Sequence, residues 1–549
     1  MNKWFKSGSP WIWMTAGAVS ISLISVIGLL LLIAWRGLVY FWPSNIYEFS
    51  LELNKTPVTV IGEVYDREEV PTSRLQGVGT DISGFQGNII ERFLIKTGNR
   101  EYVDLDFRWI LATDIKSKTA HADLVKIERN KNGNFYGYIE GVIENGKTIK
   151  DKSKYEALES VIDRAVELSD EMMDIQNGEI GSINYKLEEL RLEERSYELK
   201  GKLTAEIIAE LNAERKTLQA DYLVLEKQLM ALRADSQRDT VLVKDMRGEV
   251  VSIPVYQVLD AQFPNDMNVF EKAIQFIVQI GKFISEDPRE ANTEGGVFPA
   301  IFGTVFMVLL MAIIVTPFGV IAAIYLHEYA AKNAITKIVR ISVINLAGVP
   351  SIVYGVFGLG FFVYMLGGNI DALFYPEAQP SPTFGTPGVI WSALTLAILT
   401  LPVVIVSTEE GLSRIPTALR QGSLALGATK AETLWRIVIP MASPAIMTGL
   451  ILAVARAAGE VAPLMLVGVV KMAPTLPLDG NFPFVHLDRK FMHLGFHIYD
   501  VGFQSPNVEA ARPLVYATAF LLVSVIVTLN LTAIGIRNHL REKYKSLEH

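Results

Sequence analysis

The chain has 549 residues and no cysteine. Disulfide bonds, thiolate metal sites and cysteine nucleophiles are therefore excluded. The absence of cysteine does not indicate in which cellular compartment the protein lies. The pattern GxxxxGK[ST], whose backbone cradles nucleotide phosphates, is also absent. Net positive charge is lacking as well, because the formal charge is -8 at pH 7, and we expect no nucleic-acid partner. We expect no cofactor in this chain, so any ATP that drives its work must be bound by another subunit.

The composition predicts a chain that is divided between a membrane and water. Hydrophobic residues make up 50% of it and the mean hydropathy is +0.28, yet charged residues still reach 20%. Apolar spans joined to a polar domain explain this combination better than one soluble domain does. The length also favours more than one domain.

Six apolar runs are long enough to cross a bilayer, for which about 20 residues suffice. They cover residues 11–35, 297–326, 341–366, 388–408, 445–470 and 512–536. The first run is interpreted as an uncleaved anchor, because Ala34-Trp35-Arg36 is a poor signal-peptide cleavage site. Residues 1–36 would then comprise a cytoplasmic amino terminus and the first membrane-spanning helix.

Positive charges predict the orientation of the spans. Lysines and arginines follow the second, fourth and sixth runs, namely Lys332, Lys337 and Arg340, then Arg414, Arg420, Lys430 and Arg436, and finally Arg537, Arg541, Lys543 and Lys545. Such loops face the cytoplasm. We therefore expect a multi-pass membrane protein with both termini in the cytoplasm and residues 37–295 on the outer side of the membrane.

Residues 37–295 have the pattern of an α+β domain. Strands are predicted at 58–61 and 135–143 by β-branched and aromatic residues, and Asn-Gly pairs flank the second run as turn signals. From residue 153 to 236, Glu, Lys, Leu and Ala dominate, with Gly201 and Thr204 as turn and helix start. We expect an antiparallel helical hairpin, a solvated spacer inserted in a β domain.

A polar loop, residues 409–444, joins the fourth and fifth spans. Residues 417–426 can form a helix closed by Gly427, and residues 430–439 a second helix that should end at Pro440. A short helix-turn-helix at a cytoplasmic face fits the groove of a partner protein. A connecting loop on the lipid surface explains the same pattern, and the residues alone leave both interpretations open.

Arg456 and Glu460 lie inside the fifth apolar run. A spacing of four residues places them on one helix face, and the distance from Pro440 places Arg456 near the middle of the bilayer. An unpaired charge at that depth costs about 2.5–3.5 kcal/mol or more. Arginine offers an oxyanion a planar fork that is always charged, and Glu460 would hold it when no anion is bound. A buried ion pair that only fixes helix packing is the alternative.

Three histidines gather in the last outer loop: His486, His493 and His497. His493 and His497 stand four residues apart, a spacing that suits a metal ion, but no third ligand is evident. We expect an amphipathic re-entrant or gate segment here, and no metal.

The loop between the fourth and fifth spans resembles the EAA loop of ABC importer permeases, E-A-A-x3-G-x9-I-x-L-P. Gly427, Ile437 and Pro440 stand at the motif's glycine, isoleucine and proline. The resemblance implies that this loop couples the chain to a cleft in an ATPase subunit. Other residues occupy the first three places: Gln421, Gly422 and Ser423.

Five stretches are similar to phosphate-specific importer permeases, and their order resembles the PstA-type subunit. They are IYLHEYA at 324–330, LAGVPSIVYG at 346–355, STEE at 407–410, SLALGAT at 423–429 and RAAGEVAPL at 456–464. The resemblance covers about 297–540, and residues 1–295 resemble the amino-terminally extended form of that subunit. It implies a mostly α membrane protein with six transmembrane helices of the MetI-like type in a core of residues 296–549. It also implies import of inorganic phosphate, with the Arg–Glu motif in the phosphate path.

The resemblance further implies a second permease subunit of PstC type, an ABC ATPase dimer of PstB type and a periplasmic phosphate-binding protein of PstS type, with membrane lipid around the spans. Two alternatives stay open. One is a membrane signalling or scaffold protein whose periplasmic coiled hairpin senses a partner, and the other is a permease for another oxyanion. The Arg456–Glu460 pair and the docking loop favour transport, because a scaffold needs neither. No nucleophile–base pair or metal-ligand set of an enzyme is evident in the sequence. Only the resemblance favours phosphate over another oxyanion.

Overall fold

The computed structural model describes residues 7–53, 56–77, 85, 87–103, 106–149, 153–505 and 508–545. The chain forms two compact units. We call Met1–Tyr40 with Val297–His549 the helical unit, and Phe41–Gly296 the inserted domain.

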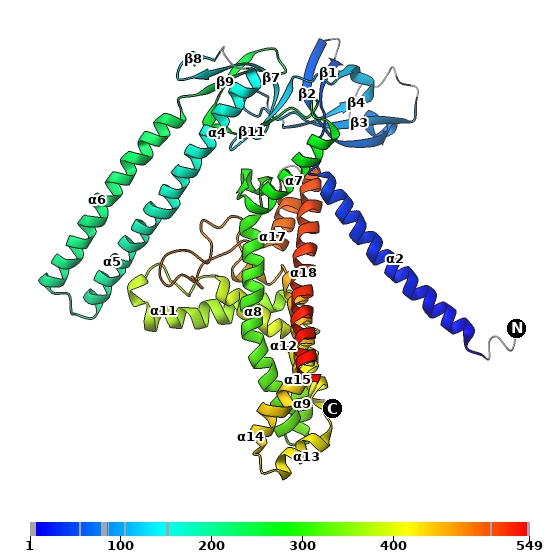
Figure 1. The fold of residues 1–549 in the computed structure, drawn as a ribbon, viewed down its shortest axis with the longest axis vertical. Helices are drawn as coiled ribbons and strands as arrows, with labels where there is room; N and C mark the ends of the chain where they lie inside the picture. The colour runs from blue at the N-terminus through cyan, green and yellow to red at the C-terminus, as the bar shows by residue number, and fades with distance from the viewer. Residues whose placement is uncertain are drawn as a thin grey trace. The chain divides into compact units, whose positions relative to one another are not determined.

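Six helices of the described chain are long and apolar enough to cross a membrane, which confirms the predicted number. They are Ser9–Val39, Phe298–Tyr329, Ser351–Phe374, Val389–Ser413, Lys430–Gly459 and Ala511–His539. Their main parts are α2 (Ser9–Val39), α8 (Phe298–Ile324), α10 (Ser351–Phe357) with α11 (Gly368–Phe374), α12 (Val389–Ser413), α15 (Ile439–Gly459) and α18 (Val508–Lys545), and Figure 1 labels all of these except α10. Shorter helices of this unit are α9 (Ala334–Leu346), α13 (Thr417–Ala425), α14 (Lys430–Thr433), α16 (Leu464–Val467) and α17 (Leu494–Tyr499).

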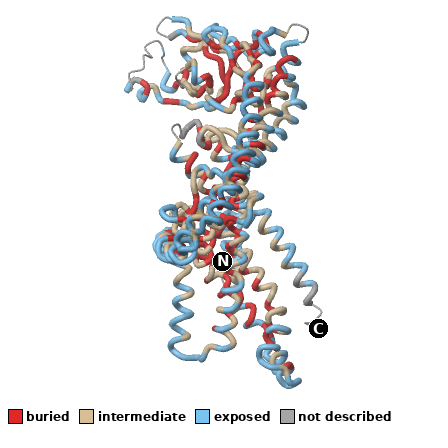
Figure 2. The backbone as a smooth tube through the Cα atoms, turned by 90° about the vertical axis from the view of Figure 1, so that its left-hand side faces the viewer, coloured by how far each residue is buried: buried red, intermediate tan, exposed pale blue. Residues whose placement is uncertain are grey.

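Helix α12 is the centre of the helical unit. It packs against α8 and α15, and α15 also packs against α18. Met311 of α8, Leu396 of α12 and Ala457 of α15 are fully buried in the shared apolar core. The buried positions, red in Figure 2, mark the interior of each unit.

The predicted third span, residues 341–366, is wrong in its limits. Helix α9 ends at Leu346, and a new helix begins at Ser351. Pro350 separates them, because proline has no backbone N–H and disfavours the α conformation in the residue before it. The new helix continues through a wide π-helical stretch, Gly358–Gly367, to Phe374.

The predicted fifth span, residues 445–470, is wrong at both ends. The helical run begins at Lys430 and passes Pro440, which the sequence predicted as a stop. A π-helical turn, Leu434–Val438, widens the backbone just before that proline and places it in the first turn of α15. At the other end the helix stops at Gly459, since Glu460 already has extended backbone angles (φ -83, ψ 126).

The inserted domain contains two antiparallel sheets. The first has the order β4-β3-β2-β1-β5 and the second β10-β9-β7-β6-β11, with β8 beside β7. The strands are β1 (Ile46–Leu53), β2 (Thr56–Pro71), β3 (Ile89–Lys96), β4 (Phe107–Leu111), β5 (Ile115–Thr119), β6 (Leu124–Arg129), β7 (Phe135–Glu144), β8 (Lys147–Thr148), β9 (Thr240–Lys244), β10 (Val250–Pro254) and β11 (Val258–Gln262). Two short strands, β12 (Pro288–Arg289) and β13 (Glu294–Gly295), pair with each other, and α3 (Thr72–Gly77) follows β2. Both Asn-Gly pairs have positive φ and form the predicted turns on either side of β7.

The helical hairpin is confirmed. Its first arm is α4 (Lys154–Met173) and α5 (Gly181–Leu199), and its second arm is α6 (Ala205–Ser236). Gly201 turns the chain with φ 64, and the Thr204 hydroxyl accepts the N–H of Ile207 as the predicted cap. Residues 174–180 do not break the first arm but form a π-helical turn within it. The hairpin follows β7 and β8 in the chain and returns to β9, which pairs with β7.

Candidate functional site

The loop between α12 and α15 folds as two short helices joined at Gly427. The N–H of Gly427 donates to the Leu424 carbonyl at 3.0 Å, and the N–H of Ala428 donates to the Ser423 carbonyl at 3.2 Å. Gly427 has φ 89, and an added Cβ would have no neighbour within 4 Å. The backbone angle alone therefore requires glycine here, as the predicted helix cap does.

Hydrogen bonds hold this helix-turn-helix in one shape. Ser423 Oγ of α13 lies 2.9 Å from Thr433 Oγ1 of α14, and both side chains are buried. Thr429 starts α14 with a reciprocal cap in which Glu432 takes part. Ser423, at the third place of the EAA motif, thus links α13 to α14 by a buried hydrogen bond.

The outer surface of this loop is apolar at two prominent positions. Leu426 is 91% exposed and Trp435 is 73% exposed. Gln421 and Gly422 are also exposed, whereas Ile437 and Pro440 are half-buried. Large exposed apolar side chains on a polar loop are typical of a protein-binding surface.

An ion pair that the sequence did not predict connects this loop to the end of α8. Beyond α8, residues Tyr325–Tyr329 form a π-helical turn. Glu328 Oε1 of this turn lies 3.1 Å from Arg420 Nη2 of α13, and its carbonyl accepts the Lys430 ammonium at 2.5 Å. Lys430 also stands 4.2 Å from the ring centre of Tyr329. The available signal was a pair of polar residues, His327-Glu328, at the end of an apolar run.

Arg456 and Glu460 lie at the end of a helix, which corrects the prediction of a pair well inside a span. Arg456 belongs to the last turn of α15, and Glu460 is the first residue beyond it. Arg456 Nε is 3.6 Å from Glu460 Oε1, a distance too long for a strong hydrogen bond. The side chains are 31% and 22% exposed, so neither is deeply buried.

The guanidinium of Arg456 has fewer contacts than those of Arg340, Arg420 and Arg489 in the helical unit. Arg340 and Arg420 each bind a carboxylate and also donate to a backbone carbonyl. Arg489 does the same with Asp479. Within the described residues, Arg456 has only its long contact with Glu460. Its terminal nitrogens are therefore available to a ligand.

Two of the motif stretches meet beside this arginine. A Cβ added to Gly355 of α10 would lie 2.7 Å from the Pro463 Cα, so the two backbones are in direct contact there. Tyr354 of the same helix lies within electrostatic range of Arg456. Two segments that are about a hundred residues apart in the chain, 351–355 and 456–463, thus touch at Gly355 and Pro463.

The histidines do not gather into one site. His486 Nε2 lies 2.8 Å from Asp479 Oδ1, and hydrogen bonds from Asn481, Arg489 and His486 outweigh burial and lower the pKa of Asp479 to about 2. Burial lowers the pKa of His493 and of His497 to about 4, so both are neutral at neutral pH. In the part of the chain that the structure describes, no three His, Asp or Glu side chains form a group that could hold a metal.

Six apolar helices of the described chain, α12 among them, define a multi-pass membrane protein with a folded polar loop between α12 and α15. Residues 315–546 match the family described as the inner membrane component of binding-protein-dependent transport systems. A relative in Bacillus subtilis, "Probable ABC transporter permease protein YqgI", is 30% identical over 45% of this chain and 79% of its own length. "Phosphate transport system permease protein PstA 1" of Mycobacterium tuberculosis is 35% identical over 44% of this chain and 71% of its own length. Inward-facing structures of the MetNI methionine ABC transporter include a chain that is 17% identical, with a TM-score of 0.33, over 44% of this chain and 94% of that one.

The chain belongs to the ABC-transporter permeases, the inner membrane components of binding-protein-dependent transport systems. It is a transmembrane subunit and not an enzyme, and a separate ATPase subunit hydrolyses ATP. The family implies an ATPase and a substrate-binding protein as partners, and no intrinsic cofactor. The family match begins at residue 315 and so does not include Phe41–Gly296, and each of the relatives named covers less than half of the chain.

Proposed function

We propose that this chain is a permease subunit of an ATP-driven importer that carries inorganic phosphate into the cytoplasm. The observation that carries the proposal is the uncommitted Arg456 guanidinium at the end of α15, 3.6 Å from its acidic neighbour. Phosphate matches the two-point donor geometry of arginine. The relatives named for phosphate transport support phosphate over other oxyanions.

In this proposal Arg456 binds the anion in the transport path, and Glu460 takes over the guanidinium when the anion leaves. A contact of 3.6 Å is long enough to exchange readily, because it lacks a well-formed hydrogen bond. The loop from Arg420 to Pro440 docks on the ATPase with Leu426 and Trp435. Glu328 transmits movement of that loop to α8 through Arg420 and Lys430.

The partners in this proposal are a second permease of PstC type, an ABC ATPase dimer of PstB type and a periplasmic phosphate-binding protein of PstS type. The second permease would complete the path, and lipid would surround the rest of the helical unit. The domain assignment is part of the same proposal. Residues 1–36 and 296–549 form the membrane part, with coupling segment 409–444, and residues 37–295 form a periplasmic domain with the hairpin 153–236.

Uptake of labelled phosphate tests the function. Cells that lack other phosphate importers and express this chain with its partners should take up phosphate in an ATP-dependent manner. An excess of sulfate should leave uptake unchanged, while arsenate, which has the same shape and charge, should compete. Uptake of sulfate with no uptake of phosphate would assign the path to another oxyanion. A chain that supports no uptake of either would favour the scaffold interpretation.

The proposed orientation predicts where reporter enzymes work. A reporter that is active only in the periplasm should work when fused after Asn265 and should be silent when fused after Arg541. The reason is the set of lysines and arginines that follow the second, fourth and sixth spans. A reporter that is active only in the cytoplasm serves as the reciprocal control. Periplasmic silence at Asn265 would contradict the orientation.

A further inference from the structure

Helix α7 (Val269–Ser285) of the inserted domain exposes its apolar face. The exposed fractions of its large apolar side chains run from 41% to 76%, at Val269, Phe270, Ile274, Ile277, Val278 and Ile284. Positions 270, 274, 277 and 284 follow steps of three, four and seven residues, so they share one side of the helix. A helix on the surface of a soluble domain shows the opposite pattern.

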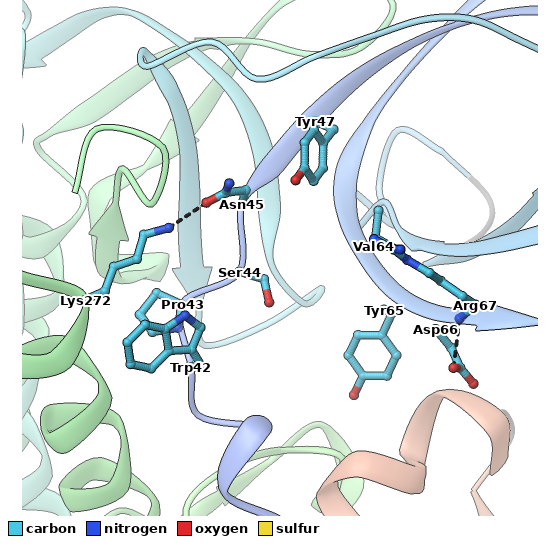
Figure 3. Close-up of a pocket in the computed structure, with 10 residues that line it drawn as sticks. All are labelled: Trp42, Pro43, Ser44, Asn45, Tyr47, Val64, Tyr65, Asp66, Arg67 and Lys272. Atoms are coloured by element: carbon cyan, nitrogen blue, oxygen red, sulfur yellow. Dashed lines mark hydrogen bonds between the residues drawn. The ribbon is translucent and has the colours of Figure 1, made fainter. Parts of the chain in front are cut away.

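The polar side of α7 faces its own domain instead. The Lys272 ammonium donates to Asn45 Oδ1 at 2.5 Å, and Lys282 pairs with Asp260 at 2.6 Å. Lys272 also borders a cavity of about 570 Å³ whose other walls include Trp42, Tyr47 and Tyr65 (Figure 3). The helix therefore directs both of its lysines toward its own domain, while six of its large apolar side chains stay exposed.

Ring contacts in the middle and at the C-terminal end of α7 fix its rotation about its axis. Phe283 is buried and its ring centre is 5.1 Å from that of Phe41, while Phe276 stands 6.0 Å from Trp42. The Asn268 side chain caps the first turn. The helix therefore does not hide its apolar face by rolling on the domain.

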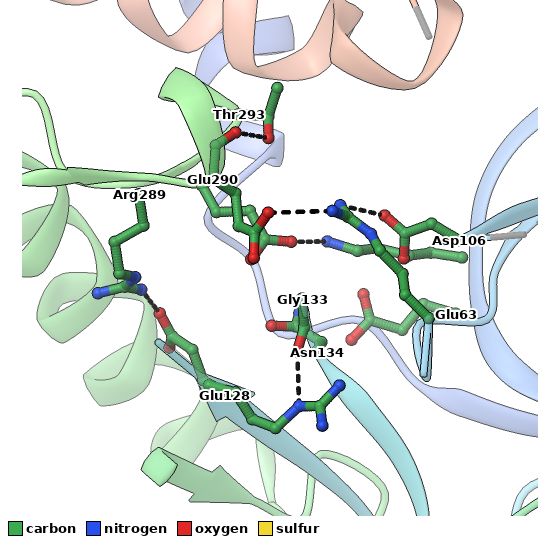
Figure 4. Close-up of polar contacts among 12 residues, drawn as sticks. Glu63, Asp106, Glu128, Gly133, Asn134, Arg289, Glu290 and Thr293 are labelled. Atoms are coloured by element: carbon green, nitrogen blue, oxygen red, sulfur yellow. Dashed lines mark hydrogen bonds and ion pairs between the residues drawn. The ribbon is translucent and has the colours of Figure 1, made fainter. Parts of the chain in front are cut away.

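The segment after α7 is held just as firmly by ion pairs (Figure 4). Glu290 binds Arg100 at 3.1 Å, Glu294 binds Lys96 at 3.2 Å, and Arg289 binds Glu128 of β6. These contacts attach residues 289–294 to both sheets. Helix α7 is thus a fixed element of the domain, and its exposed face is a permanent surface.

We propose that this face lies in the interfacial layer of the lipid bilayer, with α7 parallel to the membrane plane. Phe41 and Trp42, which pack on α7, stand two and three residues beyond Val39, where the membrane-spanning helix α2 ends. Two residues reach at most about 7 Å, so the part of α7 that packs on Phe41 and Trp42 stays close to the end of α2. Tryptophan at position 42 is also the residue type that is enriched at membrane interfaces.

The chemistry of the face fits lipid better than a protein partner. Between Phe270 and Ile284 the exposed side carries one charge, Glu271 in the first turn, and offers a partner almost no hydrogen bonds. A helix with an apolar face and flanking lysines is typical of segments that lie in the headgroup layer. The inserted domain is therefore attached to the membrane along α7 as well as through the spans at its two ends.

The absence of cysteine makes a direct test possible, because any introduced cysteine is unique. Ile274→Cys and Ile277→Cys carry a nitroxide label on the proposed lipid face. Val250→Cys is the matched control, since Val250 is also apolar and 57% exposed. Val250 lies on β10, at the edge of the sheet opposite β11, and β11 is the strand whose Asp260 pairs with Lys282 of α7. The full-length chain is reconstituted with its partner subunits in liposomes of phosphatidylethanolamine and phosphatidylglycerol.

Collision of the label with oxygen, which concentrates in lipid, is compared with collision with a water-soluble nickel complex. We expect the ratio of oxygen to nickel collisions to be severalfold higher at positions 274 and 277 than at position 250. Accessibility to nickel at both helix positions would show a water-exposed face and overturn the proposal. Low accessibility to both agents would show that protein covers the face, and would overturn it equally. Labelling two positions about one helical turn apart distinguishes a local disturbance by one label from the accessibility of the face as a whole.

Discussion

Replacing Arg456 by lysine is expected to lower phosphate uptake about 10- to 100-fold while leaving the amount of protein in the membrane unchanged. A hydrogen bond to a charged group contributes about 1.5–3 kcal/mol, and loss of one such bond gives a rate change of that size. Lysine keeps the positive charge but offers phosphate a single ammonium in place of a planar fork. The structure strengthens this expectation, because the terminal nitrogens of Arg456 have no other partner among the described residues.

Uptake is measured in cells that lack other phosphate importers, with membrane levels determined for each variant. Arg489→Lys is the control, because Arg489 is bound to Asp479 at 2.6 Å and to the Leu476 carbonyl at 2.8 Å. That variant should lose some stability but keep its uptake per molecule. Normal uptake by Arg456→Lys would leave the pair a structural feature, and the phosphate path would have to be sought in the partner subunit.

Glu460→Gln is expected to affect a different step from Arg456→Lys, namely the release of phosphate. It removes the counter-charge 3.6 Å from Arg456, so phosphate should be held longer and released more slowly. Exchanging the two residues, Arg456→Glu with Glu460→Arg, would test a purely structural ion pair only if both positions were equivalent places within one helix. They are not equivalent. Position 456 lies in the last turn of α15, where the helix dipole favours a cation and disfavours a carboxylate. The exchanged protein would lose stability for that reason alone.

Local signals in the sequence predicted local structure well. The Asn-Gly pairs beside β7, the turn at Gly201 and the cap at Gly427 all depend on positive backbone angles that few other residues adopt. The number of spans depends on composition over about 20 residues, and it was predicted correctly. These features are encoded within a few neighbouring residues, so the sequence alone reveals them.

Span limits and long-range contacts were not predictable in the same way. Residues 341–366 are apolar throughout, so hydropathy does not distinguish one helix from two separated at Pro350. Pro440 was expected to end a helix, but a π-helical turn before it accommodates the ring within a continuous run. The Glu328–Arg420 pair joins the end of the second span to the loop after the fourth, and only the fold brings these two residues together.

Replacing Gly427 by valine is expected to uncouple phosphate transport from ATP hydrolysis while leaving membrane insertion intact. The residue has φ 89, a region in which the left-handed conformation costs an L-residue about 1–2 kcal/mol and a β-branched one more. A penalty of that size lowers the population of the native turn by about 5- to 30-fold. The angle between α13 and α14 would change, and Leu426 and Trp435 would no longer be presented together to the ATPase.

Gly422→Ala is the matched control for this substitution. Gly422 lies five residues earlier in helix α13, and an added Cβ would also have no neighbour within 4 Å. Its φ is not positive, so alanine should be tolerated and should favour the helix. The measurement is phosphate-stimulated ATP hydrolysis by the reconstituted transporter with its binding protein. Equal stimulation in Gly427→Val and Gly422→Ala would show that the shape of this turn does not matter for coupling, and the docking surface would then have to lie outside residues 417–440.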